Sequence, residues 1–167
     1  DGEYYGAWAH WPPFDWEKHA PGHIDWIWVS HIHPDHFSKA TFAKLPKAIP
    51  VLIHRFETPF LKKNIEALGF EVREVHHGAP FNLGGGASIT IFAADDCNPE
   101  ICGKAFGCDA IMGTRGSSQI DTLAVFRDGR HTLVNANDFP YALAKGMLPR
   151  IKQQYGTIDL LLTGYGG

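Results

Sequence analysis

The residues best suited to metal chemistry fall in one short stretch of this chain. His31, His33 and His36 lie within six residues, and Asp35 stands directly before the last of them. On an extended backbone His31 and His33 point to the same side, so both imidazoles can bind one divalent ion at about 2.0–2.1 Å. Asp35 and His36, on the following turn, can bind a second ion. Surface histidines of a plain loop do not need this spacing, and we therefore predict a metal site here.

Two ions held in this way would supply a specific kind of chemistry. Ions about 3.5–4 Å apart hold a bridging hydroxide and polarise a substrate oxygen. Imidazole combined with carboxylate suits zinc, iron or manganese. We expect two divalent ions, with zinc as the expected metal and iron or manganese as alternatives.

The cluster is expected at the end of a buried strand. Residues 24–29 are mostly large, apolar or β-branched, and they run directly into Ser30 and the histidines. The cluster then lies on the loop at the C-terminal end of that strand. Ser38 is expected to cap a short helix over residues 39–45.

The rest of the chain mixes strands and helices, with hairpins and crossovers between them. The turns expected are at Gly84–Gly86 and at Asp128-Gly129, the second inside a hairpin. One helix is predicted with Thr58 as N-cap, Pro59 at its first position and Gly69 as its stop. Another is predicted at residues 141–154, bent or interrupted by Gly146 and Pro149. Further strands are predicted at residues 51–54, 71–75, 87–94, 121–126, 131–136 and 158–163, the last of them buried.

Composition bounds the class of protein. The 167 residues carry 18 acidic and 15 basic side chains, a net charge of -3 and 44% hydrophobic residues, which is typical of one globular domain and not of a disordered chain. Basic residues are scattered, so a small-molecule substrate is expected and nucleic acid is not. No membrane segment or signal peptide is evident, and we read Cys97, Cys102 and Cys108 as reduced thiols of a cytoplasmic protein. The oligomeric state is left open.

At these residues the chain resembles a known family. An apolar strand, Ser30 and then His31-x-His33-x-Asp35-His36 is similar to the signature of the metallo-β-lactamase superfamily, in its broad metallo-hydrolase-like branch. Residues 11–13 (Trp-Pro-Pro) also resemble a segment of the group related to the CMP-sialic acid hydroxylase. The resemblance implies an α+β fold, an αββα sandwich of two mixed sheets flanked by helices. It also implies that the four residues of the signature are metal ligands.

The resemblance extends to ligands outside the signature. It implies that Asp138, after a hairpin strand, bridges the ions, although this residue could instead cap the helix near Tyr141. The family's third histidine has no counterpart after the strand 87–94; either Asp96 or Asp95 replaces it, or His76 or His77 does, unless that pair is a plain loop pair. No histidine follows His131, so the last ligand is expected beyond Gly167. Residues 1–167 are then a single domain that lacks its first hairpin and its C-terminal ligand segment.

Three functions are consistent with these residues. The leading hypothesis is a hydrolase in which a metal-bound hydroxide attacks an ester, amide, lactone or phosphoester, with Asp138 bridging the ions and Asp35 orienting the nucleophile or passing a proton. The alternative is a diiron, oxygen-activating hydroxylase or redox enzyme, because a carboxylate such as Asp96 in place of an imidazole favours iron. The third is a non-catalytic remnant with an incomplete metal site.

Overall fold

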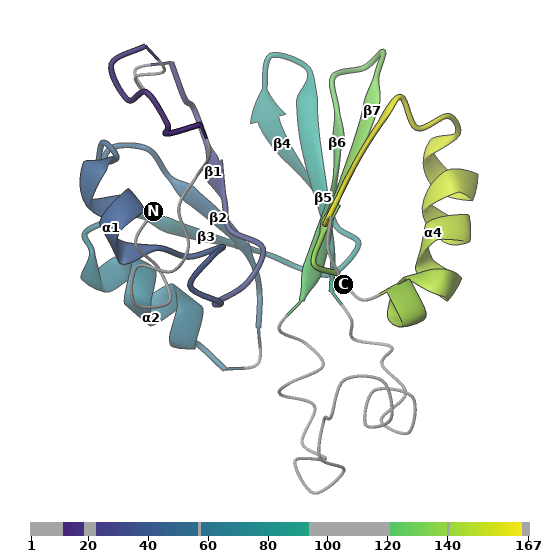
Figure 1. The fold of residues 1–167 in the computed structure, drawn as a ribbon. Helices are drawn as coiled ribbons and strands as arrows, with labels where there is room; N and C mark the ends of the chain where they lie inside the picture. The colour runs from purple at the N-terminus through teal and green to yellow at the C-terminus, as the bar shows by residue number, and fades with distance from the viewer. Residues whose placement is uncertain (1–11, 19–22, 57, 94–120, 140, 165–167) are drawn as a thin grey trace, which may run out of the picture. The chain divides into compact units, whose positions relative to one another are not determined.

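The strands of this chain form two separate sheets (Figure 1). The computed structural model describes residues 12–18, 23–56, 58–93, 121–139 and 141–164. In that part of the chain one sheet has the order β1-β2-β3 and the other the order β4-β5-β6-β7-β8. The elements are β1 Ile27–Trp28, α1 Lys39–Lys44, β2 Val51–His54, α2 Phe60–Ala67, β3 Val72–Val75, β4 Pro80–Gly84, β5 Ala87–Ala93, β6 Thr122–Arg127, β7 Thr132–Asn137, α4 Tyr141–Tyr155 and β8 Leu160–Thr163.

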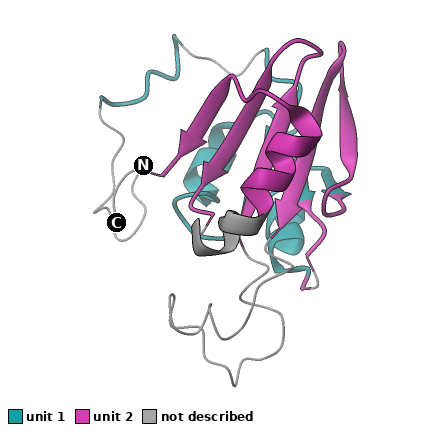
Figure 2. Cartoon of the chain, turned by 90° about the vertical axis from the view of Figure 1, so that its right-hand side faces the viewer, with its two compact units in different colours: residues 1–53, 59–74 teal, residues 54–58, 75–167 magenta. Residues whose placement is uncertain are grey.

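The chain divides into two compact units (Figure 2). The first comprises residues 1–53 and 59–74, and the second comprises residues 54–58 and 75–167. The three-stranded sheet accompanies α1 and α2 in the first unit, and the five-stranded sheet accompanies α4 in the second. The single-domain organisation expected from the resemblance stays a prediction.

In the first unit, β2 provides the buried centre of the sheet. Its residues Val51, Leu52 and Ile53 are at most 1% exposed, as a short apolar run predicts. β1 pairs in parallel with β2, and the N–H of Val29 donates to the carbonyl of Leu52 at 3.0 Å. The strand predicted over residues 24–29 is therefore present, but its ladder with β2 covers only two residues.

Both helices of the first unit end as their sequences predict. The hydroxyl of Ser38 accepts a hydrogen bond from the N–H of Thr41 at 3.2 Å, which confirms the predicted cap of α1. α2 begins at Phe60, one residue later than predicted: its N-cap is Pro59, without a side-chain hydrogen bond, and the prediction of Thr58 as N-cap is wrong. Gly69 ends that helix with a φ of +85°, a conformation that glycine adopts without strain.

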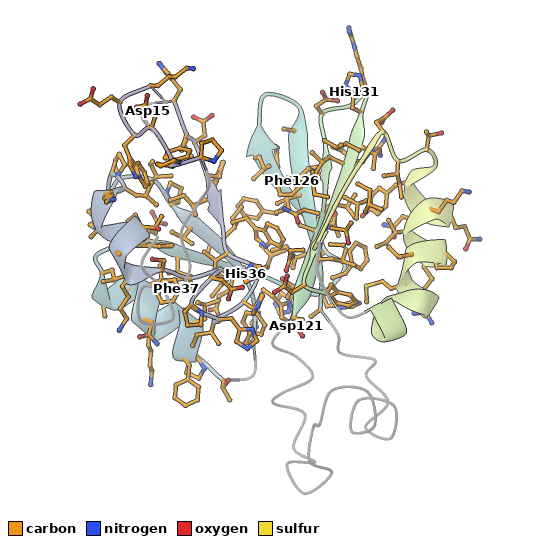
Figure 3. All side chains as sticks on the ribbon, in the orientation of Figure 1. Asp15, His36, Phe37, Asp121, Phe126 and His131 are labelled. Carbon is orange, nitrogen blue, oxygen red and sulfur yellow. The ribbon has the colours of Figure 1, made fainter. Side chains whose placement is uncertain are left out.

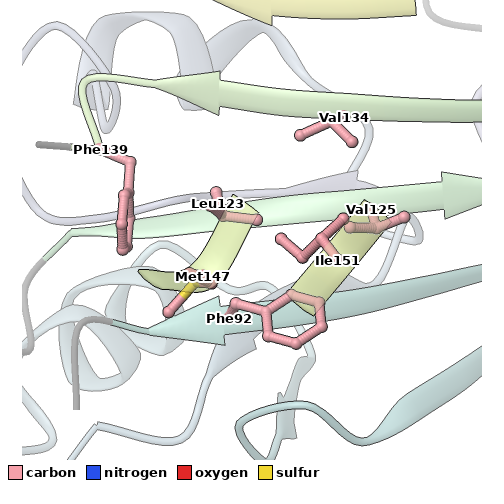
Figure 4. Close-up of a cluster of buried hydrophobic side chains, with 7 residues drawn as sticks. All are labelled: Phe92, Leu123, Val125, Val134, Phe139, Met147 and Ile151. Carbon is pink, nitrogen blue, oxygen red and sulfur yellow. The ribbon is translucent and has the colours of Figure 1, made fainter. Parts of the chain in front are cut away.

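In the second unit, α4 packs on the five-stranded sheet through an apolar core (Figure 4). The helix runs without interruption through Gly146 and Pro149, which corrects the predicted break. Burial of Met147 and Ile151 on either side of Pro149 explains this, since packing offsets the hydrogen bond that proline removes. Neither α4 nor any other helix in the described ranges is long and apolar enough to cross a membrane. The core residues are Phe92, Leu123, Val125, Val134, Phe139, Met147 and Ile151.

Two strands of the second unit differ from the sequence prediction. β4, which pairs antiparallel with β5, was not predicted, because Pro80 and Gly84 at its ends both disfavour strands. β8 was predicted to be buried, yet Leu160, Leu161 and Leu162 are 42–50% exposed. The reason is its place at the edge of the sheet, where β7 is its single neighbouring strand in the part of the chain that the structure describes. An apolar run identifies a strand, but its burial depends on neighbours that the run does not specify.

The hairpin between β6 and β7 confirms the predicted Asp-Gly turn. One carboxylate oxygen of Asp128 accepts hydrogen bonds from the N–H groups of Arg130 and His131, at 2.9 and 2.7 Å. These bonds hold the pKa of Asp128 well below its usual range, and the pKa of His131 is raised by the 3.1 Å hydrogen bond between its ring and the same carboxylate. Figure 3 shows His131 at this tip of the hairpin and Asp121 at the far end of β6.

We predict that the pKa of His131 falls toward 6.5 when Asp128 is replaced by asparagine, because the anionic partner is lost. NMR titration of the imidazole measures this directly. Asp15→Asn is the matched control, since Asp15 also accepts two backbone N–H groups in a turn but is paired with no histidine among the described residues. An unchanged His131 pKa in D128N would contradict the assigned pair.

The same pair gives a pH window for the hairpin. The raised pKa of His131 contributes stability that is fully present below pH 6.5 and is lost as pH rises through its folded value. The lowered pKa of Asp128 contributes stability that is present above pH 3.8 and is lost as pH falls through its folded value. The stability difference between wild type and D128N should therefore be greatest between pH 3.8 and 6.5, measured by urea unfolding.

We also predict that Ile151→Ala lowers the free energy of unfolding by about 2–5 kcal/mol, because Ile151 is fully buried in the core beneath α4. Lys152→Ala, on the exposed side of the same turn, is the control and should change stability by less than about 0.5 kcal/mol. Equal losses in the two variants would contradict the packing of α4 described here.

Candidate metal centre

The loop after β1 gathers three imidazole rings. His31 is fully buried, whereas His33 is exposed. The carbonyl of His33 accepts the N–H groups of His36 and Phe37 at 2.9 and 2.8 Å, so the chain turns tightly between the second and third histidines. The ring of His31 consequently lies 4.6 Å from that of His33 and 4.2 Å from that of His36, between centroids.

The ligand atoms on this loop form two pairs. His31 Nε2 and His33 Nδ1 are 2.9 Å apart. Two nitrogens that each lie about 2.0–2.1 Å from one ion are separated by about 2.9–3.4 Å when the angle at the ion is 90–109°. This pair therefore fits a single ion. Asp35 Oδ2 and His36 Nε2 are 3.2 Å apart, which fits a second ion in the same way.

Ser30, part of the signature but given no role there, contacts two of the three rings. Its hydroxyl oxygen is 3.0 Å from His31 Nδ1 and 3.4 Å from His36 Nδ1. Ser30 is 5% exposed, so its hydroxyl is buried. Its place directly before His31 is the only signal in the sequence.

In the second unit, carboxylates gather at one edge of the sheet. Residues Ala93 of β5 and Thr122 of β6 are paired, so the end of β5 and the start of β6 share this edge. Asp121 precedes β6 there, and Asp138 follows β7, which runs antiparallel to β6. Sequence reasoning missed Asp121, because only the register of the strands brings it to the edge where β7 ends. Asp95 and Asp96 follow β5 in the chain and lie outside the described residues.

A strained turn holds Asp138 at that edge. Asn137 has a φ of 33°, and its side chain accepts the N–H of Asp138 at 2.7 Å and donates to the carbonyl of Thr122 at 3.0 Å. The N–H of Gly164, after β8, donates to the carbonyl of Asn137 at 2.9 Å. A β-carbon at Gly164 would lie 3.1 Å from that carbonyl oxygen and 3.4 Å from the carboxylate of Asp138. Asparagine and glycine therefore allow the two strand ends to meet beside the carboxylate.

His76 and His77 are engaged in hydrogen bonds of their own. His77 Nδ1 accepts the N–H of Ala93 at 3.1 Å, which in a neutral ring places the hydrogen on Nε2. His76 Nε2 is 3.3 Å from a guanidinium nitrogen of Arg55, which can only donate. Each ring thus has one nitrogen in use as an acceptor, and this favours the loop-pair interpretation over a metal ligand.

We predict that Asn137→Ala lowers the free energy of unfolding by about 2–3 kcal/mol, because it removes two hydrogen bonds and leaves a β-carbon at positive φ. Asn137→Gly loses the same bonds without the backbone strain, and we expect a smaller loss of about 1 kcal/mol. Urea unfolding separates the two. A glycine variant no more stable than the alanine variant would contradict the strain at this turn.

Known proteins of similar sequence exist for this chain, although no protein-family profile matches it. It is 28% identical over 170 aligned residues to a Mycobacterium tuberculosis (strain H37Rv) protein provisionally named a Rieske 2Fe-2S iron-sulfur protein, a match that covers 98% of this chain and 29% of that protein. This chain thus spans less than a third of that relative's length. The 2Fe-2S cluster in the relative's name refers to that whole protein.

Solved structures agree on the architecture. CmlA, a diiron β-hydroxylase from Streptomyces venezuelae, matches with a TM-score of 0.60 and 17% identity over 93% of this chain and 28% of its own. An isothiocyanate hydrolase from Delia radicum gut bacteria matches with a TM-score of 0.57 and 20% identity, over 83% of this chain and 48% of its own. YhfI of Bacillus subtilis, described as a metallo-β-lactamase fold protein, matches at 0.50 and 17% identity over 84% of this chain and 52% of its own. The two-sheet architecture expected from the signature is confirmed: the chain has the metallo-β-lactamase fold.

Proposed function

We propose that this chain is the metal-binding part of an oxygen-activating iron enzyme of the hydroxylase class, acting on a small molecule. The observation that carries the proposal is the spacing of the two ligand pairs, 2.9 Å for His31 with His33 and 3.2 Å for Asp35 with His36. Donor atoms at these separations fit two ions, and the mixture of imidazole and carboxylate suits iron as well as zinc.

Two likenesses support iron over zinc. One is the diiron β-hydroxylase, which shares the fold over 93% of this chain. The other is the M. tuberculosis relative with the 2Fe-2S name. A 2Fe-2S centre carries electrons, which hydroxylation by dioxygen consumes and hydrolysis does not. The diiron function that stood second in the sequence analysis therefore becomes the first candidate.

In this proposal the named side chains have different roles. His31 and His33 would hold one ion, and Asp35 and His36 would hold the other. On the resemblance alone, Asp138 and Asp96 would be further ligands. Bound iron would supply the reduction of dioxygen. Asp35, with a side chain 23% exposed, is the group placed to accept or pass a proton near the solvent.

Hydrolysis is the second candidate. The isothiocyanate hydrolase has the same fold, and the imidazole and carboxylate groups of the His-x-His-x-Asp-His loop would suit zinc in place of iron. The two candidates differ in the metal that the chain retains and in whether electrons are consumed, so metal content separates them.

We predict about two iron ions per chain and a visible absorption band in protein purified without added metal, measured by elemental analysis and spectroscopy. His33→Ala should lose metal and absorbance, and because His33 is exposed the variant should still fold. His131→Ala is the matched control, as this histidine pairs with Asp128 in a hairpin turn.

Other outcomes each overturn a stated part of the proposal. Two zinc ions without a visible band would favour the hydrolase. Wild type without metal would indicate the non-catalytic remnant. Unchanged metal content in His33→Ala would show that the ligand pairs are wrongly assigned, and unchanged content in Asp138→Ala would remove that residue from the centre.

A further inference from the structure

The buried hydroxyl of Ser30 touches one histidine from each ligand pair. It lies 3.0 Å from His31 Nδ1 and 3.4 Å from His36 Nδ1. The two rings are 4.2 Å apart between centroids and tilted by 35°, so one atom can reach the same nitrogen of both. We propose that Ser30 is a positioning residue that aims the Nε2 atoms of His31 and His36 at two different ions. This inference rests on the proposed metal centre and goes beyond its ligand set.

The atoms available to Ser30 explain how it would act. A neutral histidine that binds a metal through Nε2 carries its hydrogen on Nδ1. Both Nδ1–H groups then need an acceptor, and a hydroxyl oxygen has two lone pairs to accept them. Ser30 is therefore matched in number to the two rings. Accepting both hydrogens would fix the orientation of each ring, while a metal on Nε2 would set the tautomer.

An acceptor shared by two metal-binding histidines should affect both ions when it is removed. Loss of a group that contacted His31 alone would weaken only the ion held with His33. Because His31 and His36 share Ser30, removal of the hydroxyl should weaken both ions. Ser30→Thr should preserve the binding of both ions, since the contact requires only the hydroxyl oxygen.

The test compares Ser30→Ala and Ser30→Thr with wild type. Metal-free full-length chain is titrated with Zn²⁺ against a competing chelator, and both binding steps are measured. We expect Ser30→Ala to weaken each step by about 10–100-fold, as is typical when a partner of a metal-bound histidine is removed. Ser30→Thr keeps the hydroxyl and should bind within a few-fold of wild type.

A second readout reports on the rings themselves. In the zinc-loaded protein, nitrogen-15 NMR should show His31 and His36 with hydrogen on Nδ1, slowly exchanging in wild type and rapidly exchanging in Ser30→Ala. Ser38→Ala is the matched control, because Ser38 is a nearby buried serine whose hydroxyl caps α1. It should leave both zinc affinities and both Nδ1–H signals unchanged.

Each result has one interpretation. Equal zinc affinity of Ser30→Ala and wild type at both steps would overturn the positioning role, and weakening of one step only would overturn the shared contact. Failure of Ser30→Thr to restore binding would show that packing, and not the hydroxyl, matters. If wild type itself binds no zinc, the proposed metal centre fails, which is a different outcome from any of these.

Discussion

The structure depends on the burial of one polar side chain. His31 is fully buried, and a buried imidazole is costly unless both of its nitrogens have partners. Nδ1 meets the hydroxyl of Ser30 and Nε2 meets His33 Nδ1, both within 3.0 Å. The backbone hydrogen bonds of Val29 with Leu52 and of the turn at His33 hold these partners in place. The apolar strands of the first unit thus bring polar nitrogens together, with His31 buried beside the exposed His33.

In the second unit, two carboxylates lie at the same end of neighbouring strands. The register of β5, β6 and β7 sets Asp121 and Asp138 at one edge of its sheet. Asn137 accepts a positive φ so that Asp138 follows directly, and Gly164 leaves room beside it. Backbone strain of this kind clusters at functional sites, so the positive φ of Asn137 is consistent with a role for the carboxylate that follows it.

The sequence predicted those features that depend on local order. The His-x-His-x-Asp-His loop, the cap at Ser38 and the Asp128-Gly129 hairpin each follow from a few adjacent residues, and the structure shows all three. Helix α4 passes through Pro149 and β8 is exposed because neighbours distant in sequence decide both, so neither could be predicted.

The candidate site was predictable only in part, for the same physical reason. The spacing of His31, His33, Asp35 and His36 pointed to a metal site, because residues two apart on an extended backbone direct their side chains to the same side. The contact of Ser30 depends on ring rotation, which spacing does not describe. Asp121 depends on strand register, and the hydrogen bonds of His77 depend on a backbone N–H from another strand.

The most direct test of the central claim is a crystal structure of the iron-loaded chain with anomalous diffraction at the iron edge. The account predicts two anomalous peaks, one within about 2.0–2.2 Å of His31 Nε2 and His33 Nδ1, and the other equally close to His36 Nε2 and Asp35. Peaks bonded to His31 or His36 through Nδ1, or located away from this loop, would contradict it.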